Sequence, residues 1–116
     1  MTPDRVAVAR ARLGALRREA LERNAHLTRS FDGIVEATAD VATDDEHDPE
    51  GHTIAWERQQ VAALLDETTH ALAQIDAAER RIDDGTYRTC TVCGSPIDPA
   101  RLDALPASPT CVTCAG

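Results

Sequence analysis

The stretch that decides the fold is CTVCGSPIDPARLDALPASPTCVTC, residues 90–114. It contains the four cysteines of the chain, Cys90, Cys93, Cys111 and Cys114, as two Cys-x-x-Cys pairs with 17 residues between them. A Cys-x-x-Cys turn directs two thiolates at one centre, and two such turns complete a tetrahedron around zinc. The spacing therefore predicts one zinc ion held by these four cysteines.

Two other readings of the cysteines are a pair of disulfides and a redox pair with two spare thiols. The N-terminal segment MTPDRVAVARARLG lacks the uninterrupted apolar run of a secretory signal, and no βαβ pattern is present. We therefore expect a cytoplasmic protein with reduced thiols. Four cysteine ligands leave no open position for water, so the zinc is expected to be structural and not catalytic.

The residues before the cysteines predict two long helices. Apolar residues recur every seven positions, which is typical of a coiled-coil seam. In the first helix these are Val6, Leu13, Ala20, Leu27, Ile34 and Val41, and in the second Ile54, Val61, Thr68, Ile75 and Ile82. Capping signals place the start of the first helix at Thr2-Pro3-Asp4. The second helix is expected to begin at Asp48-Pro49-Glu50 or at Thr53, and to end at Gly85.

A short link between two such helices makes them antiparallel neighbours. The sequence thus predicts a mainly α fold, in which a long antiparallel coiled-coil hairpin is followed by a small C-terminal four-cysteine zinc finger. We expect the hairpin to span residues 1–85, with a tip loop at about 43–52, and the finger to span residues 86–116. No stretch approaches the roughly 20 apolar residues that a membrane-spanning helix needs.

Charge is unevenly distributed along the predicted hairpin. The net charge is −8, and all 12 strong bases are arginines. Seven arginines lie in residues 1–30, whereas residues 31–50 carry eight acids and no strong base. The acidic tip is open to three readings: a solvated turn, an adventitious metal site that includes His47 and His52, or a surface presented to a partner.

Several elements around the cysteines resemble the DksA/TraR family of bacterial zinc-finger transcription factors. They are Gly85-Thr86-Tyr87, Cys-x-x-Cys-Gly, Ile97, Arg101-Leu102-x-Ala104-x-Pro106 and a closing Cys-x-x-Cys-Ala. The resemblance covers about 31 residues. It implies a protein that binds RNA polymerase rather than DNA, and whose coiled coil enters the secondary channel of the enzyme.

The resemblance also implies that acids at the tip act near the polymerase active site. The family tip motif is Asp-x-x-Asp-x-Ala, and Asp45 and Asp48 fit its acidic half, while Glu50 stands in place of the alanine. Many family members act together with ppGpp. Because the second helix has few bases, essentially Arg58, Arg80 and Arg81, we assign no nucleotide or other cofactor site besides zinc.

We therefore expect a monomeric transcription regulator that binds RNA polymerase, with no catalytic residues of its own. A DNA-binding zinc-finger protein is one alternative, although an acidic chain is poorly suited to neutralising phosphates and we expect no direct sequence-specific DNA binding. The other alternative is an interaction scaffold in which the heptads pair between chains, with Trp56, which lies off the apolar seam, as a contact.

Overall fold

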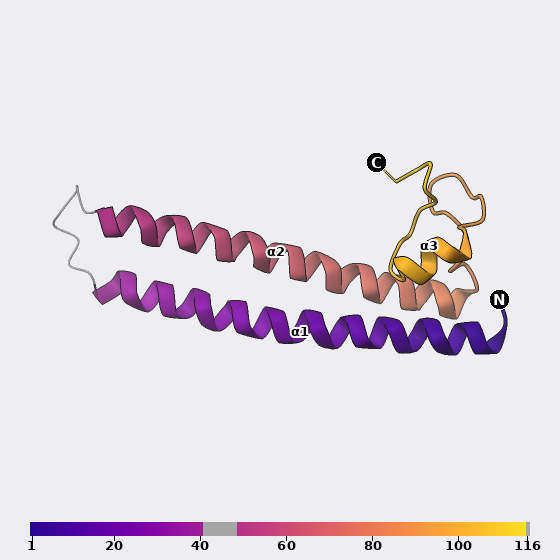
Figure 1. Ribbon diagram of the computed structural model, residues 1–116, viewed down its shortest axis with the longest axis horizontal. Coiled ribbons are helices and arrows are strands. Elements are labelled where there is room, and N and C mark those ends of the chain that lie inside the picture. Colours follow the sequence, from indigo (N-terminus) through magenta and orange to yellow (C-terminus); the bar gives the residue numbers. More distant parts are fainter. Residues whose placement is uncertain (41–48, 116) are drawn as a thin grey trace. The chain divides into compact units, whose positions relative to one another are not determined.

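A computed structural model describes the chain at residues 1–40 and 49–115, and the side chains at residues 1–36 and 53–115. It contains helices α1 (Pro3–Asp40), α2 (Pro49–Asp84) and α3 (Pro99–Ala104), which Figure 1 labels. The described residues include no strand, and their one isolated β-bridge joins Thr89 and Pro96. The predicted mainly α fold is therefore confirmed.

Both starts of the long helices and the end of α2 lie at signals that the sequence provides. At the start of α1, the backbone N–H of Arg5 donates to the side-chain oxygen of Thr2 at 3.3 Å. Helix α2 begins at Pro49, the earlier of the two predicted starts. Its last residue is Asp84; the following Gly85 has φ of +80°, and Thr86 N–H donates to the Arg81 carbonyl at 2.9 Å. This left-handed stop satisfies carbonyls of the last turn that would otherwise lack partners.

The chain packs as two compact units. The terminal unit contains Met1–Glu19 and Ala71–Gly116, and the central unit contains Ala20–His70. Each unit includes a part of α1 and a part of α2, so the two are described separately below.

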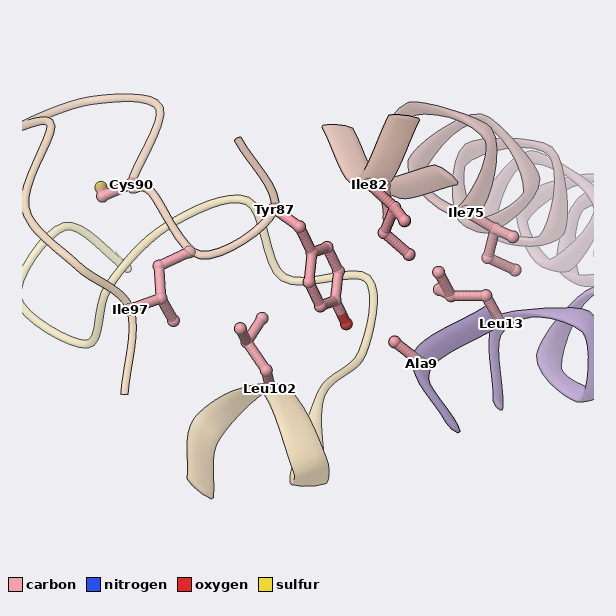
Figure 2. Packing of buried hydrophobic residues seen from close by; sticks show 9 residues of the cluster. Ala9, Leu13, Ile75, Ile82, Tyr87, Cys90, Ile97 and Leu102 are labelled. Atoms are coloured by element: carbon pink, nitrogen blue, oxygen red, sulfur yellow. The ribbon is translucent and has the colours of Figure 1, made fainter. Parts of the chain in front are cut away.

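The terminal unit is built around one hydrophobic cluster. Leu13 of α1 and Ile97 of the cysteine-containing segment are fully buried in it. The buried members of the cluster are Ala9, Leu13, Ile75, Ala78, Ile82, Tyr87, Cys90, Ile97 and Leu102. Figure 2 shows Tyr87 between the helix residues Ile82 and Ala9 on one side and Leu102 and Ile97 on the other. The helix pair and the cysteine-containing segment therefore share a core.

Ion pairs flank this cluster and fix the direction of the helices in the terminal unit. Arg10 of α1 contacts Asp83 of α2 at 2.6 Å, and Arg17 forms a fork with Asp76 and with Glu79, the latter at 2.6 Å. As the residue number increases along α1, that of its partner on α2 decreases, so the helices run antiparallel here. Each pair is partly exposed and contributes no more than about 1 kcal/mol.

In the central unit the same helices pair through a smaller apolar seam. Asn24 of α1 donates from its side-chain amide to the hydroxyl of Thr68 on α2 at 3.0 Å, and Thr68 is 4% exposed. The guanidinium of Arg58 lies 5.7 Å from the centre of the Phe31 ring. These pairs again run in opposite directions along the two helices, which makes the central unit antiparallel as well.

The heptad prediction agrees with the burial of the side chains. The seam residues whose side chains are described are all buried or half-buried, whereas Trp56, off the seam, is 61% exposed. In the described part of the chain, no helix combines the length and the apolar character that crossing a membrane requires. The tip acids Asp45 and Asp48 lie outside the described residues.

Replacing a glycine inside α1 and a glycine after α2 by alanine should change the free energy of unfolding in opposite directions. A Cβ added at Gly33 in α1 would meet no atom within 4 Å, whereas Gly85 has the positive φ that disfavours other residues. We expect Gly33→Ala to raise the free energy of unfolding by about 1 kcal/mol and Gly85→Ala to lower it by about 1–2 kcal/mol. Urea unfolding followed by circular dichroism measures both, and equal effects would contradict the assignment of the Gly85 stop.

The core of the terminal unit can be tested with two leucines of α1. Leu13 is fully buried, whereas Leu21 is 51% exposed. Leu13→Ala removes buried methyl groups and leaves a cavity, so we expect a loss of about 2–5 kcal/mol in the free energy of unfolding. Leu21→Ala is the matched control and should change stability by less than about 0.5 kcal/mol. Comparable losses for the two variants would show that α1 does not bury the predicted face.

Candidate metal centre

The first cysteine pair sits in a tight turn after α2. Cys90 N–H donates to the Ser95 carbonyl at 2.8 Å, and Gly94 N–H donates back to the Cys90 carbonyl at 3.0 Å. Gly94 has φ of +74°, which glycine adopts without the steric penalty of a side chain. The turn thereby holds the Cys90 and Cys93 side chains on the same side of the backbone.

The second cysteine pair is brought back to the first by α3 and the segment after it. Asp98 caps α3, because its carboxylate accepts from Ala100 N–H at 3.0 Å. Thr91 N–H donates to the Pro109 carbonyl at 2.9 Å, which joins the first turn to the returning chain. In the second turn, Cys114 N–H donates to the Cys111 carbonyl at 3.1 Å.

The four thiols gather at one point. Their Sγ atoms all lie within 4.8 Å of one another, and Cys93 Sγ is 3.7 Å from Cys111 Sγ. Zinc–sulfur bonds of about 2.3 Å in a tetrahedron place the sulfurs about 3.8 Å apart. The observed separation fits that geometry and is far longer than the roughly 2.05 Å of a disulfide. All four cysteines are free, so the disulfide reading is not supported.

Hydrogen bonds prepare some of these thiols as thiolates. The backbone N–H groups of Cys93 and Cys111 lower the pKa of Cys90 to about 6, and the side chain of Ser95 lowers the pKa of Cys93. The Cys114 thiol lies beside Cys111 and Cys93, and these neighbours raise its pKa to about 12. A metal ligand must be deprotonated, so metal binding releases the proton of Cys114. Metal binding is therefore tighter at higher pH.

The metal centre is attached to the helix pair through shared contacts of the terminal unit. Cys90 is 2% exposed and belongs to the hydrophobic cluster. The Tyr87 hydroxyl donates to the Pro106 carbonyl at 2.6 Å, and Arg12 of α1 donates to the Asp103 carbonyl in α3 at 2.7 Å. Ordering the four thiols therefore also orders the segment that packs on α1 and α2.

Residues 85–116 match the family described as the prokaryotic dksA/traR C4-type zinc finger. These residues therefore form a zinc finger of the dksA/traR type. Among solved structures, the fold of the chain is similar to that of transcription factor DksA2 from Pseudomonas aeruginosa, with a TM-score of 0.79 and 22% sequence identity. The similarity covers 97% of this chain and 81% of that one, and at this identity it concerns the fold. Comparison with curated proteins gives no match.

The expectation of one structural zinc is confirmed by the family of the finger and by the closeness of four cysteines. The four thiolates of this DksA/TraR finger would hold the ion, whose chemistry is to cross-link the segment. The sequence analysis did not predict that Arg12 binds the finger, nor that Asp98 caps α3. The Asp98-Pro99 pair repeats the cap-and-proline signal used for α2 and could have indicated this cap. Arg12 carries no such local signal.

Removing the metal should unfold the finger and leave most of the helical signal, since α1 and α2 are long and paired. We expect a chelator to remove the chemical-shift dispersion of the amide NMR signals of residues 85–116. The circular dichroism signal of the helices should decrease only slightly. Adding zinc back should restore the signals, and Cys93→Ser should reproduce the loss without a chelator. Finger signals and thiol reactivity that stay unchanged on chelation would contradict a structural metal.

Proposed function

We propose that the chain is a transcription factor that binds RNA polymerase and changes the initiation of transcription. The observation that carries the proposal is the combination of a DksA/TraR finger with a fold that matches transcription factor DksA2 over 97% of the chain. The protein then acts in the cytoplasm, as a monomer, by binding the polymerase and not by catalysing a reaction.

In this proposal the metal supports the fold, and acidic residues carry the effect. Four thiolates around one zinc leave no position for a substrate or a water, so the centre lacks the open site that catalysis requires. The paired helices would enter the secondary channel with residues 43–52 foremost. Asp45 and Asp48 would then place negative charge near the metal-containing active site, where the electrostatic effect of a carboxylate is large because little water screens it.

Direct DNA binding is less well supported by the structure. The finger has two strong bases, and the Nε atoms of both are withdrawn from solvent contact: Arg101 Nε donates to the Thr110 carbonyl at 2.9 Å, and Arg88 Nε is buried. Helix α3 has six residues and carries Asp103 as well as Arg101. A DNA-binding surface instead needs several exposed bases on one element.

An interaction scaffold that pairs its heptads between chains is also less well supported. The seam residues of each unit are already covered by the other helix of the same chain, as the contacts Asn24–Thr68 and Arg17–Glu79 illustrate. A second chain would find few apolar seam side chains to bury in either unit. Sedimentation that gives a monomer mass at all concentrations would agree with this conclusion.

The proposal is tested by co-purification with RNA polymerase, followed by transcription in vitro. We expect Asp45→Asn/Asp48→Asn to bind the polymerase as the wild type does but to lose its effect on initiation, because the negative charge is removed without a change in shape. Asp66→Asn/Glu67→Gln removes the same charge from exposed positions on α2 and is the control. A double tip variant that regulates like the wild type would show that the tip residues are assigned wrongly.

A further inference from the structure

A hollow of the terminal unit lies directly beside the cysteines. We call it the thiol hollow; the residues that matter to its chemistry are Cys93, Arg101, Leu105, Cys111, Val112 and Cys114. All of them belong to the terminal unit. The volume of the hollow is about 760 Å³, whereas one water takes up roughly 30 Å³ in the liquid. The hollow is therefore far larger than the space that a single metal ion fills between the thiols.

The four thiols differ in how solvent reaches them. Cys90 is 2% exposed, belongs to the buried cluster and does not line the thiol hollow. Cys93 is exposed, while Cys111 and Cys114 are half-buried, and these three line the hollow. A tetrahedral set of ligands is entered through one of its triangular faces. The face formed by Cys93, Cys111 and Cys114 is the one open to the hollow, and Cys90 closes the opposite side.

Arg101 brings an unpaired positive charge to the thiol hollow. Its Nε donates to the Thr110 carbonyl at 2.9 Å, but its Nη atoms form no hydrogen bond or ion pair with the described residues. Asp98 is the acid among the described residues that line the hollow, and its carboxylate accepts from Ala100 N–H at 3.0 Å. The Nη groups of Arg101 are thus left as donors for an occupant of the hollow.

This charge matters because of what surrounds the metal. Four thiolates and one Zn²⁺ carry a net negative charge, which repels an approaching thiolate. Arg101 offsets part of that repulsion, and a guanidinium also binds a carboxylate through two parallel hydrogen bonds. Leu105 is 52% exposed and Val112 is 73% exposed, so both offer apolar surface to a short carbon chain. The hollow therefore suits a small molecule with a thiol at one end and a carboxylate at the other.

We propose that the thiol hollow is an exchange site, where a small thiol that carries a carboxylate removes zinc from the finger or delivers it. The entering thiol forms a sulfur–zinc bond, and the bond from Cys93 to zinc breaks, because Cys93 is the exposed ligand. The proton that the entering thiol loses passes through water to the Cys93 sulfur, and no electron is transferred. The same replacement at Cys111 and Cys114 frees the ion, and the reverse order loads it.

This exchange needs no open position on the metal, since one sulfur replaces another. A centre with four buried thiols would instead lose zinc only when the finger unfolds. The exchange site gives the chain a zinc content that follows the zinc and thiol around it, while α1 and α2 stay paired. The inference goes beyond the proposed function and does not depend on it, and its tests use no polymerase.

The dependence of the rate on thiol concentration tests the exchange site. Zinc-loaded full-length chain is mixed without oxygen with 3-mercaptopropionate, and a coloured zinc chelator reports the metal that leaves. We expect the rate to rise in proportion to the thiol. At equal thiolate concentration, it should be about two- to fivefold higher than with neutral 2-mercaptoethanol, as one exposed ion pair allows. A rate that is independent of the thiol would mean that zinc leaves by unfolding of the finger, and would overturn the proposal.

Variants of Arg101 test the recognition of the carboxylate. Arg101→Gln removes the charge and keeps an amide donor for the Thr110 carbonyl. The preference for 3-mercaptopropionate over 2-mercaptoethanol should disappear, while Arg101→Lys should keep most of it. A general change in the stability of the finger would not alter this preference, because it is a ratio of two rates in one protein. A preference that is unchanged in Arg101→Gln would contradict the proposed site.

Two valines provide a matched test of the route. Val92 and Val112 each lie inside a Cys-x-x-Cys pair and are 71% and 73% exposed, and of the two it is Val112 that lines the thiol hollow. Val112→Trp should fill part of the hollow and slow the release of zinc by both thiols, whereas Val92→Trp should release zinc as the wild type does. Equal rates in the two variants would overturn the hollow as the route. Both variants keep Arg101, so this test holds even if Arg101→Gln fails to retain zinc.

Discussion

The convergence of four sulfur atoms on one point is the constraint on which the terminal unit depends. Residues 85–116 contribute Tyr87, Cys90, Ile97 and Leu102 to the buried cluster, which is too little apolar surface for a segment of this size to fold alone. A zinc ion at the thiols closes the chain and removes the entropy of a long loop. The cluster then extends without a break from the metal ligands to the helix residue Leu13.

The pairing of α1 and α2 depends on a second regularity, the seven-residue repeat. Arg10, Arg17, Asn24 and Phe31 are seven residues apart, and each contacts α2 through an ion pair, a hydrogen bond or a cation–π contact. The contacts that flank the apolar seam are thus directional, whereas burial of the seam is not. Arginine suits these positions because its planar guanidinium binds two carboxylates at once, as Arg17 does.

Because of these two constraints, the groups that hold the fold together are not the charged groups that a partner could contact. The zinc and the cluster around Tyr87 fix the finger to the helices, and none of them is open to a substrate. Charge is concentrated elsewhere: residues 43–52 carry five acids in the sequence, and Arg5, Arg12 and Arg88 line a hollow of the terminal unit. The proposed function fits this division, since a regulator that works by binding keeps its contacts available to a partner while its fold is held by other groups.

The sequence alone determined the features that depend on spacing or on nearest neighbours. Cysteine spacing predicted the zinc centre, the heptads predicted the buried faces, and Gly85 predicted the end of α2, because each signal is a residue type at a fixed spacing or a single residue at a helix end. Whether Asp45 and Asp48 act at the tip stays a prediction. Only the tertiary structure decided that Arg12 binds Asp103, 91 residues away, and that Arg88 lines a hollow. Contacts between residues so distant in the chain leave no periodic signal, since they arise when the metal centre folds the finger against α1.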